Sequence, residues 1–174
     1  MVEALQGDAD WAVTFRPFSL QQNHNQPEET DVWDVALDSD QGSGVRALLW
    51  SLGIRDEFPD EFLGFHTAMF AARHDEALDI SDESVISDVA TSVGLDAPTL
   101  AGLVASGIPQ KQLKTEHLSL LEDHEVFGVP TFIIGDEAVF VRVMDRHNIP
   151  DIERVVDMIG WTNVNEFKRT SIAQ

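Results

Sequence analysis

Histidine and cysteine supply many of the nucleophiles and metal ligands that work at neutral pH, and this chain has few of them. Its 174 residues include six histidines and no cysteine. Without a thiol, the chain has no disulfide, no thiolate nucleophile and no cysteine-ligated zinc or iron–sulfur site. His66 and His74 share one predicted helix, and His117 and His124 share another. Each pair lies about two turns apart, too far for the i, i+4 spacing of a helical metal site. We therefore expect no metal and no cofactor, and a partly buried structural role for His66.

Two glycines fit the start of a nucleotide-binding turn. Gly42 and Gly44 open a G-x-G-x-x-A pattern just before a predicted helix, as in a dinucleotide-binding fold. That fingerprint also needs a strand directly before it, and residues 31–41 hold four aspartates that would repel a pyrophosphate. The favoured interpretation is a loop before an amphipathic helix. Nucleotide binding at Gly42 and Gly44 is kept as a remote alternative.

A proline begins an apolar run in the stretch EVFGVPTFIIG, residues 125–135. Proline cannot donate to a β-ladder, so within sheets it is confined to strand starts, edges and bulges. Because an X-Pro bond adopts cis at low cost, the Val129–Pro130 bond is a candidate for cis. The runs 131–135 and 138–143 flank a Gly-Asp turn and predict a β-hairpin. The first run is apolar on both faces, which is typical of a central strand.

The elements that must position this turn are mostly helical. Residues 12–17 alternate in polarity and predict a strand, 21–31 predict a loop, and 31–44 fit either a short helix or a loop. Six helices are predicted from the spacing of apolar residues. Three are given by their ranges: 45–52, which Gly53 stops, 60–74 and 109–126. The other three are bounded by capping and stop residues: Ser81 to Gly94, Asp96 to Gly107, and Asn148 to Gly160. This order predicts an α/β fold with a helical block between two parts of a sheet.

The amino-acid composition limits which classes of partner this protein can bind. The chain carries 31 acidic and 11 basic residues, a net charge of −20, which repels phosphate backbones and anionic membranes. It has no apolar stretch of the length that spans a bilayer and no signal-peptide pattern at its start. Its length and its 43% hydrophobic content fit one domain over 1–174. We expect a cytoplasmic protein that binds neither nucleic acid nor membrane.

Two stretches in order carry a family resemblance: VTFRPFSL near the start, and VFGVPTFIIGDEAVFV followed by a helix and NEFKRT at the end. With them, the whole chain resembles the DsbA-like thioredoxin-fold oxidoreductases. The likeness is strongest to the actinobacterial branch of mycothiol-dependent nitroreductases and predicted dithiol-disulfide isomerases, a group related to 2-hydroxychromene-2-carboxylate isomerases. The resemblance implies a thioredoxin-like α/β fold with an all-helical insertion over roughly 29–125.

The resemblance also implies a site and shows what the chain lacks. In that family the Gly-Val-Pro-Thr turn is the cis-proline loop, so Val129, Pro130 and Thr131 would bind substrate. The family's Cys-x-x-Cys turn and its first strand have no counterpart here, and we expect them upstream of Met1. The resemblance therefore implies a truncated or cysteine-less member of the family without dithiol activity as written. The alternative is a binding module that uses the cis-proline groove for a peptide or a small thiol.

The absent first strand would leave two strand edges unpaired. In the family that strand lies between the predicted strand at 12–17 and the strand after the proline. Buried backbone groups without partners cost roughly 1–3 kcal/mol each, so we expect the gap to be filled. Three ways remain open: direct pairing of 12–17 with 131–135, a strand from a second copy in a homodimer, or an upstream peptide.

Overall fold

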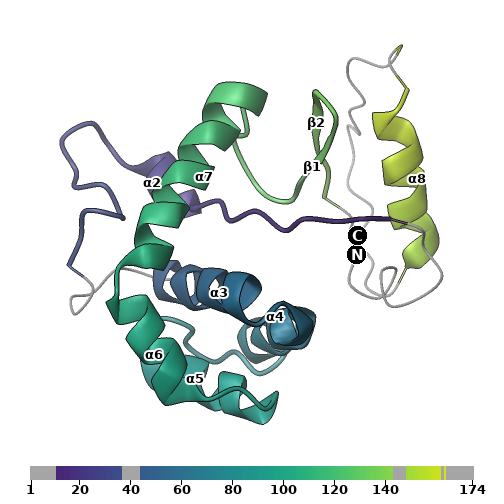
Figure 1. Cartoon of the computed structure of the whole chain (residues 1–174). Helices are drawn as coiled ribbons and strands as arrows, with labels where there is room; N and C mark the ends of the chain where they lie inside the picture. The colour runs from purple at the N-terminus through teal and green to yellow at the C-terminus, as the bar shows by residue number, and fades with distance from the viewer. Residues whose placement is uncertain (1–10, 37–43, 143–147, 162, 164–174) are drawn as a thin grey trace.

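The computed structural model describes residues 11–36, 44–142, 148–161 and 163. These residues form a helical block, a β-hairpin and a separate helix that covers the hairpin (Figure 1). The elements are α2 (Leu20–His24), α3 (Val45–Glu57), α4 (Pro59–His74), α5 (Glu83–Ser92), α6 (Ala97–Ala105), α7 (Ile108–His124), β1 (Thr131–Ile134), β2 (Glu137–Phe140) and α8 (Ile149–Ile159). The predicted α/β class with a helical block before the hairpin is confirmed.

The helical block has one main core. Side chains from α3, α4, α5 and α6 meet in a cluster that includes Trp50, Ile54, Phe65, Ile86 and Leu100, each at most 1% exposed. These residues recur every three or four positions along their helices, which is the periodicity of an amphipathic helix. Burial of about 25 cal/mol per Å² of apolar surface makes such a cluster the main stabilising term of the block.

The prediction that Gly53 stops the helix at 52 is wrong, because α3 continues to Glu57. Gly53 is buried in the middle of α3, where a Cβ atom would lie 2.9 Å from Cδ2 of Leu103 on α6. The glycine therefore lets α6 approach α3 closely. A helix–helix contact, which is invisible in the local sequence, outweighs the low helix propensity of glycine.

Polar side chains cap α2, α5, α6 and α8, with one shift from the expected position. Asp96 and Asn148 cap α6 and α8 as the sequence predicts. The predicted cap at Ser81 is wrong, since the carboxylate of Asp82 accepts the backbone N–H of Ser84 at 2.9 Å. The Ser81 hydroxyl instead donates to Asp79 at 2.7 Å. Aspartate and serine are both good caps, and the neighbouring turn decides between them.

The prediction of a strand at 12–17 is wrong, because these residues run as an extended chain without a ladder partner in the described part of the protein (Figure 1). The predicted loop at 21–31 begins instead with the short helix α2, capped by the Ser19 hydroxyl. Residues 31–36 form turns, not a helix. Within the described residues, side chains from the helical block, and not a neighbouring strand, hold the extended chain.

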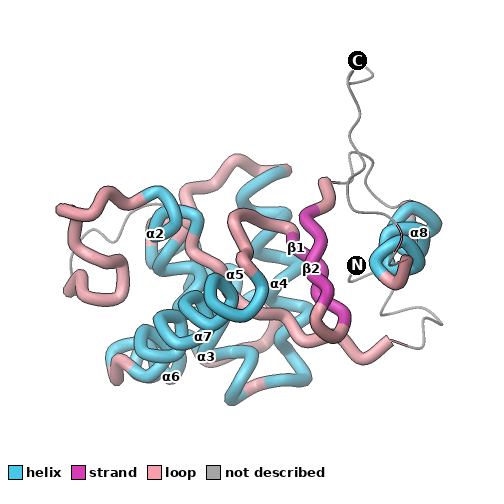
Figure 2. The backbone as a smooth tube through the Cα atoms, turned by 90° about the horizontal axis from the view of Figure 1, so that it is seen from above, coloured by secondary structure: helices cyan, strands magenta, loops and turns pink. Residues whose placement is uncertain are grey.

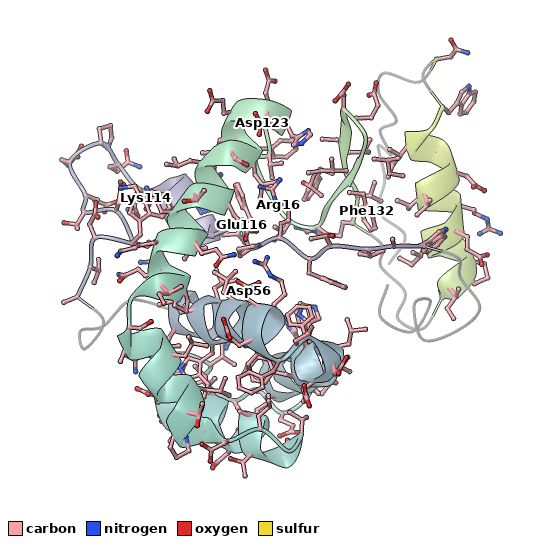
Figure 3. The ribbon with its side chains drawn as sticks, viewed as in Figure 1. Arg16, Asp56, Lys114, Glu116, Asp123 and Phe132 are labelled. Atoms are coloured by element: carbon pink, nitrogen blue, oxygen red, sulfur yellow. The ribbon has the colours of Figure 1, made fainter. Side chains whose placement is uncertain are left out.

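A network of ion pairs and hydrogen bonds attaches residues 12–17 to the helical block. The guanidinium of Arg55 donates to the carbonyl of Phe15 at 2.8 Å and to both carboxylate oxygens of Glu116 at 2.6 and 3.1 Å. Arg16 points toward Glu116 as well, with 3.7 Å between Nε and Oε2 (Figure 3). Although partial burial opposes the charge, hydrogen bonds to Glu116 and Asp56 raise the pKa of Arg55. The network joins the extended chain to α3 and α7.

The predicted hairpin is confirmed. β1 and β2 are antiparallel, with Thr131 opposite Phe140 and Ile134 opposite Glu137, and Gly135 turns the chain at φ +61°. From above, the hairpin stands between the helical block and α8 (Figure 2). Ile133 packs on the side of the block, against Phe18, Leu120 and Val126. The central position expected for 131–135 is not observed, because within the described residues the sheet has two strands.

Candidate functional site

The turn between α7 and β1 holds the three residues that the sequence singles out. The Val129–Pro130 peptide bond is cis. The Thr131 hydroxyl donates to the carbonyl of Gly128 at 2.7 Å. A Cβ atom on Gly128 would lie 3.3 Å from the ring of Phe140 on β2, so the turn sits tightly on the hairpin. These contacts fix the backbone on both sides of Val129.

Two further hydrogen bonds connect this turn to its neighbours. The side-chain amide of Asn23 on α2 donates to the carbonyl of Phe127 at 3.1 Å. The carbonyl of Pro130 accepts the backbone N–H of Val141 at 3.2 Å. The turn is therefore attached to α2 on one side and to the end of the hairpin on the other. Because the turn is held on both sides, a ligand that binds its backbone groups would lose little free energy to ordering the loop.

Val129 lies at the surface of this turn. Its side chain is 42% exposed. Pro130 is exposed too, whereas Thr131 is half-buried at the start of β1. Among the described residues, none pairs with the backbone N–H or carbonyl of Val129. The turn thus presents an apolar side chain and free backbone groups together.

A cavity of about 280 Å³ adjoins this turn. Its walls come from residues 18–21, the first half of α3, the second half of α4, Ile80 and Val129. We call it the α3–α4 cavity. Of the three site residues predicted from sequence, Val129 contributes to its wall, and Pro130 and Thr131 do not. The structure therefore brings one predicted site residue together with a set of helical residues that the sequence did not point to.

The cavity has an apolar interior and a partly apolar rim. Phe65 is fully buried at its wall, and Phe18 and Met69 are 6% and 7% exposed. At the rim, Leu20 and Phe70 are 43% and 56% exposed. Exposed large apolar side chains around a concave apolar surface are typical of ligand sites.

His66 occupies the middle of the α4 wall among aromatic rings. Its imidazole lies 4.8 Å from the ring of Phe70, 5.1 Å from Phe15 and 5.6 Å from Phe62, measured between centroids. Burial lowers the pKa of His66. The partly buried role expected for this residue agrees with its position. A neutral imidazole offers one hydrogen-bond donor and one acceptor to a ligand in the cavity.

The remaining ionisable wall residues are Arg73 and His74, in the last turn of α4. Both are exposed. The imidazole of His74 lies 5.5 Å from the ring of Phe70, so it continues the aromatic row that begins deeper along α4. No aspartate or glutamate belongs to the described wall of the cavity.

His117 is a supporting residue that the sequence reasoning missed. It is fully buried on α7, stacked on Phe18 at 4.4 Å, and its Nδ1 accepts the backbone N–H of Ser19 at 3.2 Å. Phe18 and Ser19 are both wall residues of the cavity. Burial lowers the pKa of His117, and the charge of Asp31 opposes this. Its spacing from the buried Leu113 and Leu120 is i, i+4, i+7, a signal that places it on the core face of α7.

Several other chemistries lack support in the described residues. No three histidine, aspartate or glutamate side chains there are grouped so that they could hold a metal ion. Gly44 is the N-cap of α3 and lines the cavity, whereas Gly42 lies outside the described residues. Residues 31–36 are not a strand, so the strand that the nucleotide fingerprint needs is missing from that stretch. No described helix combines the length and the apolar character needed to cross a bilayer.

Two comparisons place the chain among known proteins. The family model of the DSBA-like thioredoxin domain matches residues 1–156. The uncharacterised protein YwbO of Bacillus subtilis (strain 168) is 25% identical over 158 residues, which covers 79% of this chain and 78% of YwbO. The family match includes the walls of the α3–α4 cavity and the turn that carries Val129.

Proposed function

Because this chain belongs to the family of the DSBA-like thioredoxin domain, we propose that it is a binding module of that family. It takes a small thiol, or a thioether derived from one, into the α3–α4 cavity beside Val129, Pro130 and Thr131. The chain performs no thiol–disulfide exchange of its own, since its 174 residues contain no cysteine to form the mixed disulfide.

One observation carries this proposal. Val129, the residue before the cis-proline, is exposed in the turn and also forms part of the wall of the α3–α4 cavity. A ligand in the cavity would therefore lie beside the backbone of the turn. The N–H and carbonyl of Val129, which pair with none of the described residues, would orient its polar part, and the apolar wall would hold its chain.

The size of the cavity and the charge of the chain support a small ligand. About 280 Å³ is near the lower end of ligand pockets, and it fits a molecule rather than a folded partner. The net charge of −20 repels nucleic acid. Nucleotide binding at Gly42 and Gly44 has no supporting strand in the described residues, and we do not propose it.

An extended peptide is a second candidate ligand. It is favoured by the unpaired backbone of Val129, which directly precedes β1 and offers a donor and an acceptor to a strand-like segment. A peptide would contact the turn and its exposed side chains without filling the cavity. The two candidates therefore differ in whether the cavity wall matters for affinity.

Titration calorimetry with glutathione, S-hexylglutathione and an unstructured apolar peptide tests the proposal. We expect S-hexylglutathione to bind more tightly than glutathione, because its hexyl chain enters the cavity. Ser51→Leu places an apolar side chain at the α3 wall and should weaken S-hexylglutathione about tenfold. Ser87→Leu makes the same change on α5, away from the cavity, and serves as the matched control.

The outcomes separate the candidates. Peptide binding that Ser51→Leu leaves unchanged, with no binding of the glutathione compounds, supports the second candidate and contradicts the first. Absence of any saturable heat contradicts both. Thermal unfolding of each variant shows whether a loss of binding reflects a loss of folding.

A further inference from the structure

His117 makes a hydrogen bond that requires the neutral form of its imidazole. Its Nδ1 atom accepts the backbone N–H of Ser19 at 3.2 Å, so the ring proton lies on Nε2. A second proton would go to Nδ1, and the ring would then have two donors and no acceptor. The N–H of Ser19 would face another donor. Protonation of His117 therefore breaks this bond.

Solvent cannot replace the lost bond while the two residues stay in place. His117 is 0% exposed and Ser19 is 1% exposed. The Nε2 atom of His117 is buried as well, and it has no hydrogen-bond partner among the described residues. A buried donor without an acceptor costs roughly 1–3 kcal/mol, and a buried unpaired charge costs more. The protonated ring therefore favours a conformation in which Ser19 has moved away from α7.

The charges around the ring do not compensate for this loss. Asp31 acts on His117 through its charge, but its two carboxylate oxygens already accept hydrogen bonds from Gln22 and Trp33. Burial outweighs the charge of Asp31 and lowers the pKa of His117. Other charged side chains on the elements around the ring form ion pairs with one another: Arg16, Asp34, Arg55, Lys114 and Glu116.

The bond to His117 supports α2, which in turn holds the cis-proline turn. Ser19 is the N-cap of α2, and its hydroxyl accepts the backbone N–H of Gln22 at 3.1 Å. None of the five residues of α2 is buried, so hydrogen bonds rather than apolar packing keep this helix in place. One of them runs from the side chain of Asn23 to the carbonyl of Phe127, at 3.1 Å. A segment with little buried apolar surface opens at low cost.

We propose that His117 is a pH-sensitive switch: protonation of its imidazole detaches Ser19 from α7, and α2 then releases its hold on the cis-proline turn. At neutral pH the switch keeps the cavity wall at Phe18 and Ser19 in place, together with the turn that carries Val129. In acid the candidate site loses both supports. The switch belongs to the chain itself and needs no ligand.

Amide hydrogen exchange of the ¹⁵N-labelled protein without ligand, followed by NMR from neutral pH downward, tests this switch. The readout is the protection factor, which corrects each exchange rate for the intrinsic effect of pH. The protection factor of Ser19 should fall by up to tenfold per pH unit below 6.5. It should stay below those of Ile54 and Ala90, which are buried in α3 and α5, because Ser19 opens locally. The amide resonance of Gly128, which shares a peptide group with the carbonyl of Phe127, should shift in the same pH range.

Three variants separate the steps. His117→Gln keeps an acceptor at this position but takes up no proton, so the protection factor of Ser19 should stay within twofold below pH 6.5. His124→Gln makes the same change two turns further along α7, at a residue that accepts no bond from Ser19, and should keep the wild-type response. Asn23→Ala should keep the response of Ser19 and remove that of Gly128, because it cuts the connection to Phe127.

Two results would overturn the switch. One is a Ser19 protection factor equal to those of Ile54 and Ala90 at every pH. The other is the same pH dependence of Ser19 in His117→Gln and in the wild type. Should His117→Gln fail to fold, the ¹⁵N shifts of the His117 ring in the wild type decide instead: titration of the ring without loss of Ser19 protection would also overturn the switch. Since no ligand takes part, none of these results affects the proposed function.

Discussion

The Nδ1 atom of the buried His117 accepts the backbone N–H of Ser19 at 3.2 Å. This bond joins α7 to the segment that leads into α2. Because Phe18 and Ser19 form part of the cavity wall, a side chain that contacts no ligand fixes one side of the candidate site. His117 is thus a positioning residue for the wall.

His117→Leu should lower the free energy of unfolding by about 2 kcal/mol, because it leaves the buried N–H of Ser19 without an acceptor. Urea denaturation measures this change, and hydrogen exchange should show faster exchange of the Ser19 amide. His124→Leu on the same helix is the control, since His124 is half-buried and accepts no bond from Ser19. It should change stability by less than about 0.5 kcal/mol. Unchanged protection of the Ser19 amide in His117→Leu would contradict the role of this bond.

His66 on the cavity wall and the supporting residue His117 should make stability depend on pH. Burial lowers the pKa of both His66 and His117 from the ordinary value of 6.5, so the unfolded chain binds protons that the folded chain does not. Stability is then fully present above pH 6.5 and is lost as pH falls. We expect a slope of up to about 1.4 kcal/mol per pH unit for each histidine as the pH falls below 6.5.

Urea denaturation across that pH range, with wild type and His66→Gln, measures the effect. The variant should show a shallower slope in this window. The lowered pKa values of Asp79, Asp82 and Asp96 act in a more acidic window, below the ordinary carboxyl value of 3.8. A wild-type stability that does not fall as the pH drops below 6.5 would be at odds with buried neutral histidines.

Gly53 should not tolerate a larger side chain. A Cβ atom there would already lie 2.9 Å from Leu103, so Gly53→Leu should lower the free energy of unfolding by about 2 kcal/mol through overpacking. Gly64 on α4 is exposed, and a Cβ atom added to it would meet no heavy atom within 4 Å. Gly64→Leu should therefore stabilise the protein by several tenths of a kcal/mol through helix propensity. Equal effects at both sites, read from denaturant midpoints, would refute the close approach of α3 and α6.

The ion pair of Arg55 and Glu116 should be worth more than a surface pair. Both side chains are about 15% exposed, and Arg55 also holds the carbonyl of Phe15. Arg55→Met should cost about 2 kcal/mol and speed hydrogen exchange in residues 12–17. Lys114 and Asp34 lie 4.0 Å apart and are 45% and 60% exposed, so Lys114→Met should cost less than about 0.5 kcal/mol. If exchange in 12–17 did not change in Arg55→Met, the network would not be what holds this segment.

Thr131 should influence binding through the position of Val129. Thr131→Val keeps the shape of the side chain but removes the hydroxyl that donates to Gly128 at 2.7 Å. We expect a loss of about 1 kcal/mol in stability and about threefold weaker binding of S-hexylglutathione. Thr131→Ser keeps the donor and should restore both. Equal behaviour of the valine and serine variants would mean that this hydrogen bond does not position the turn.

The sequence predicts local features of this fold better than long-range ones. Helix faces, the caps at Asp96 and Asn148, and the hairpin turn at Gly135 depend on neighbouring residues, and they are observed. Gly53 and the segment 12–17 depend on partners far along the chain. Gly53 faces Leu103 on another helix, and the alternation at 12–17 does not show that Arg55, rather than a strand, holds that backbone.

In the candidate site too, the local features could be predicted from the sequence, whereas the long-range ones could not. The turn around Val129 is a contiguous motif, so its proline and its place before β1 can be predicted. The cavity joins segments that are distant in sequence, and no local pattern predicts that Val129 and Arg73 share one wall. His66 could be assigned to a partly buried position from its apolar neighbours, but its place in a ligand cavity could not.

The central claim is that a ligand enters the α3–α4 cavity beside Val129. The most direct measurement is a titration of the ¹⁵N-labelled protein with S-hexylglutathione, followed by backbone amide NMR. We predict saturable shifts that cluster at residues 18–21, the first half of α3, the second half of α4 and Val129. Shifts that cluster on α8 or β2 instead, or the absence of saturable shifts, would contradict it.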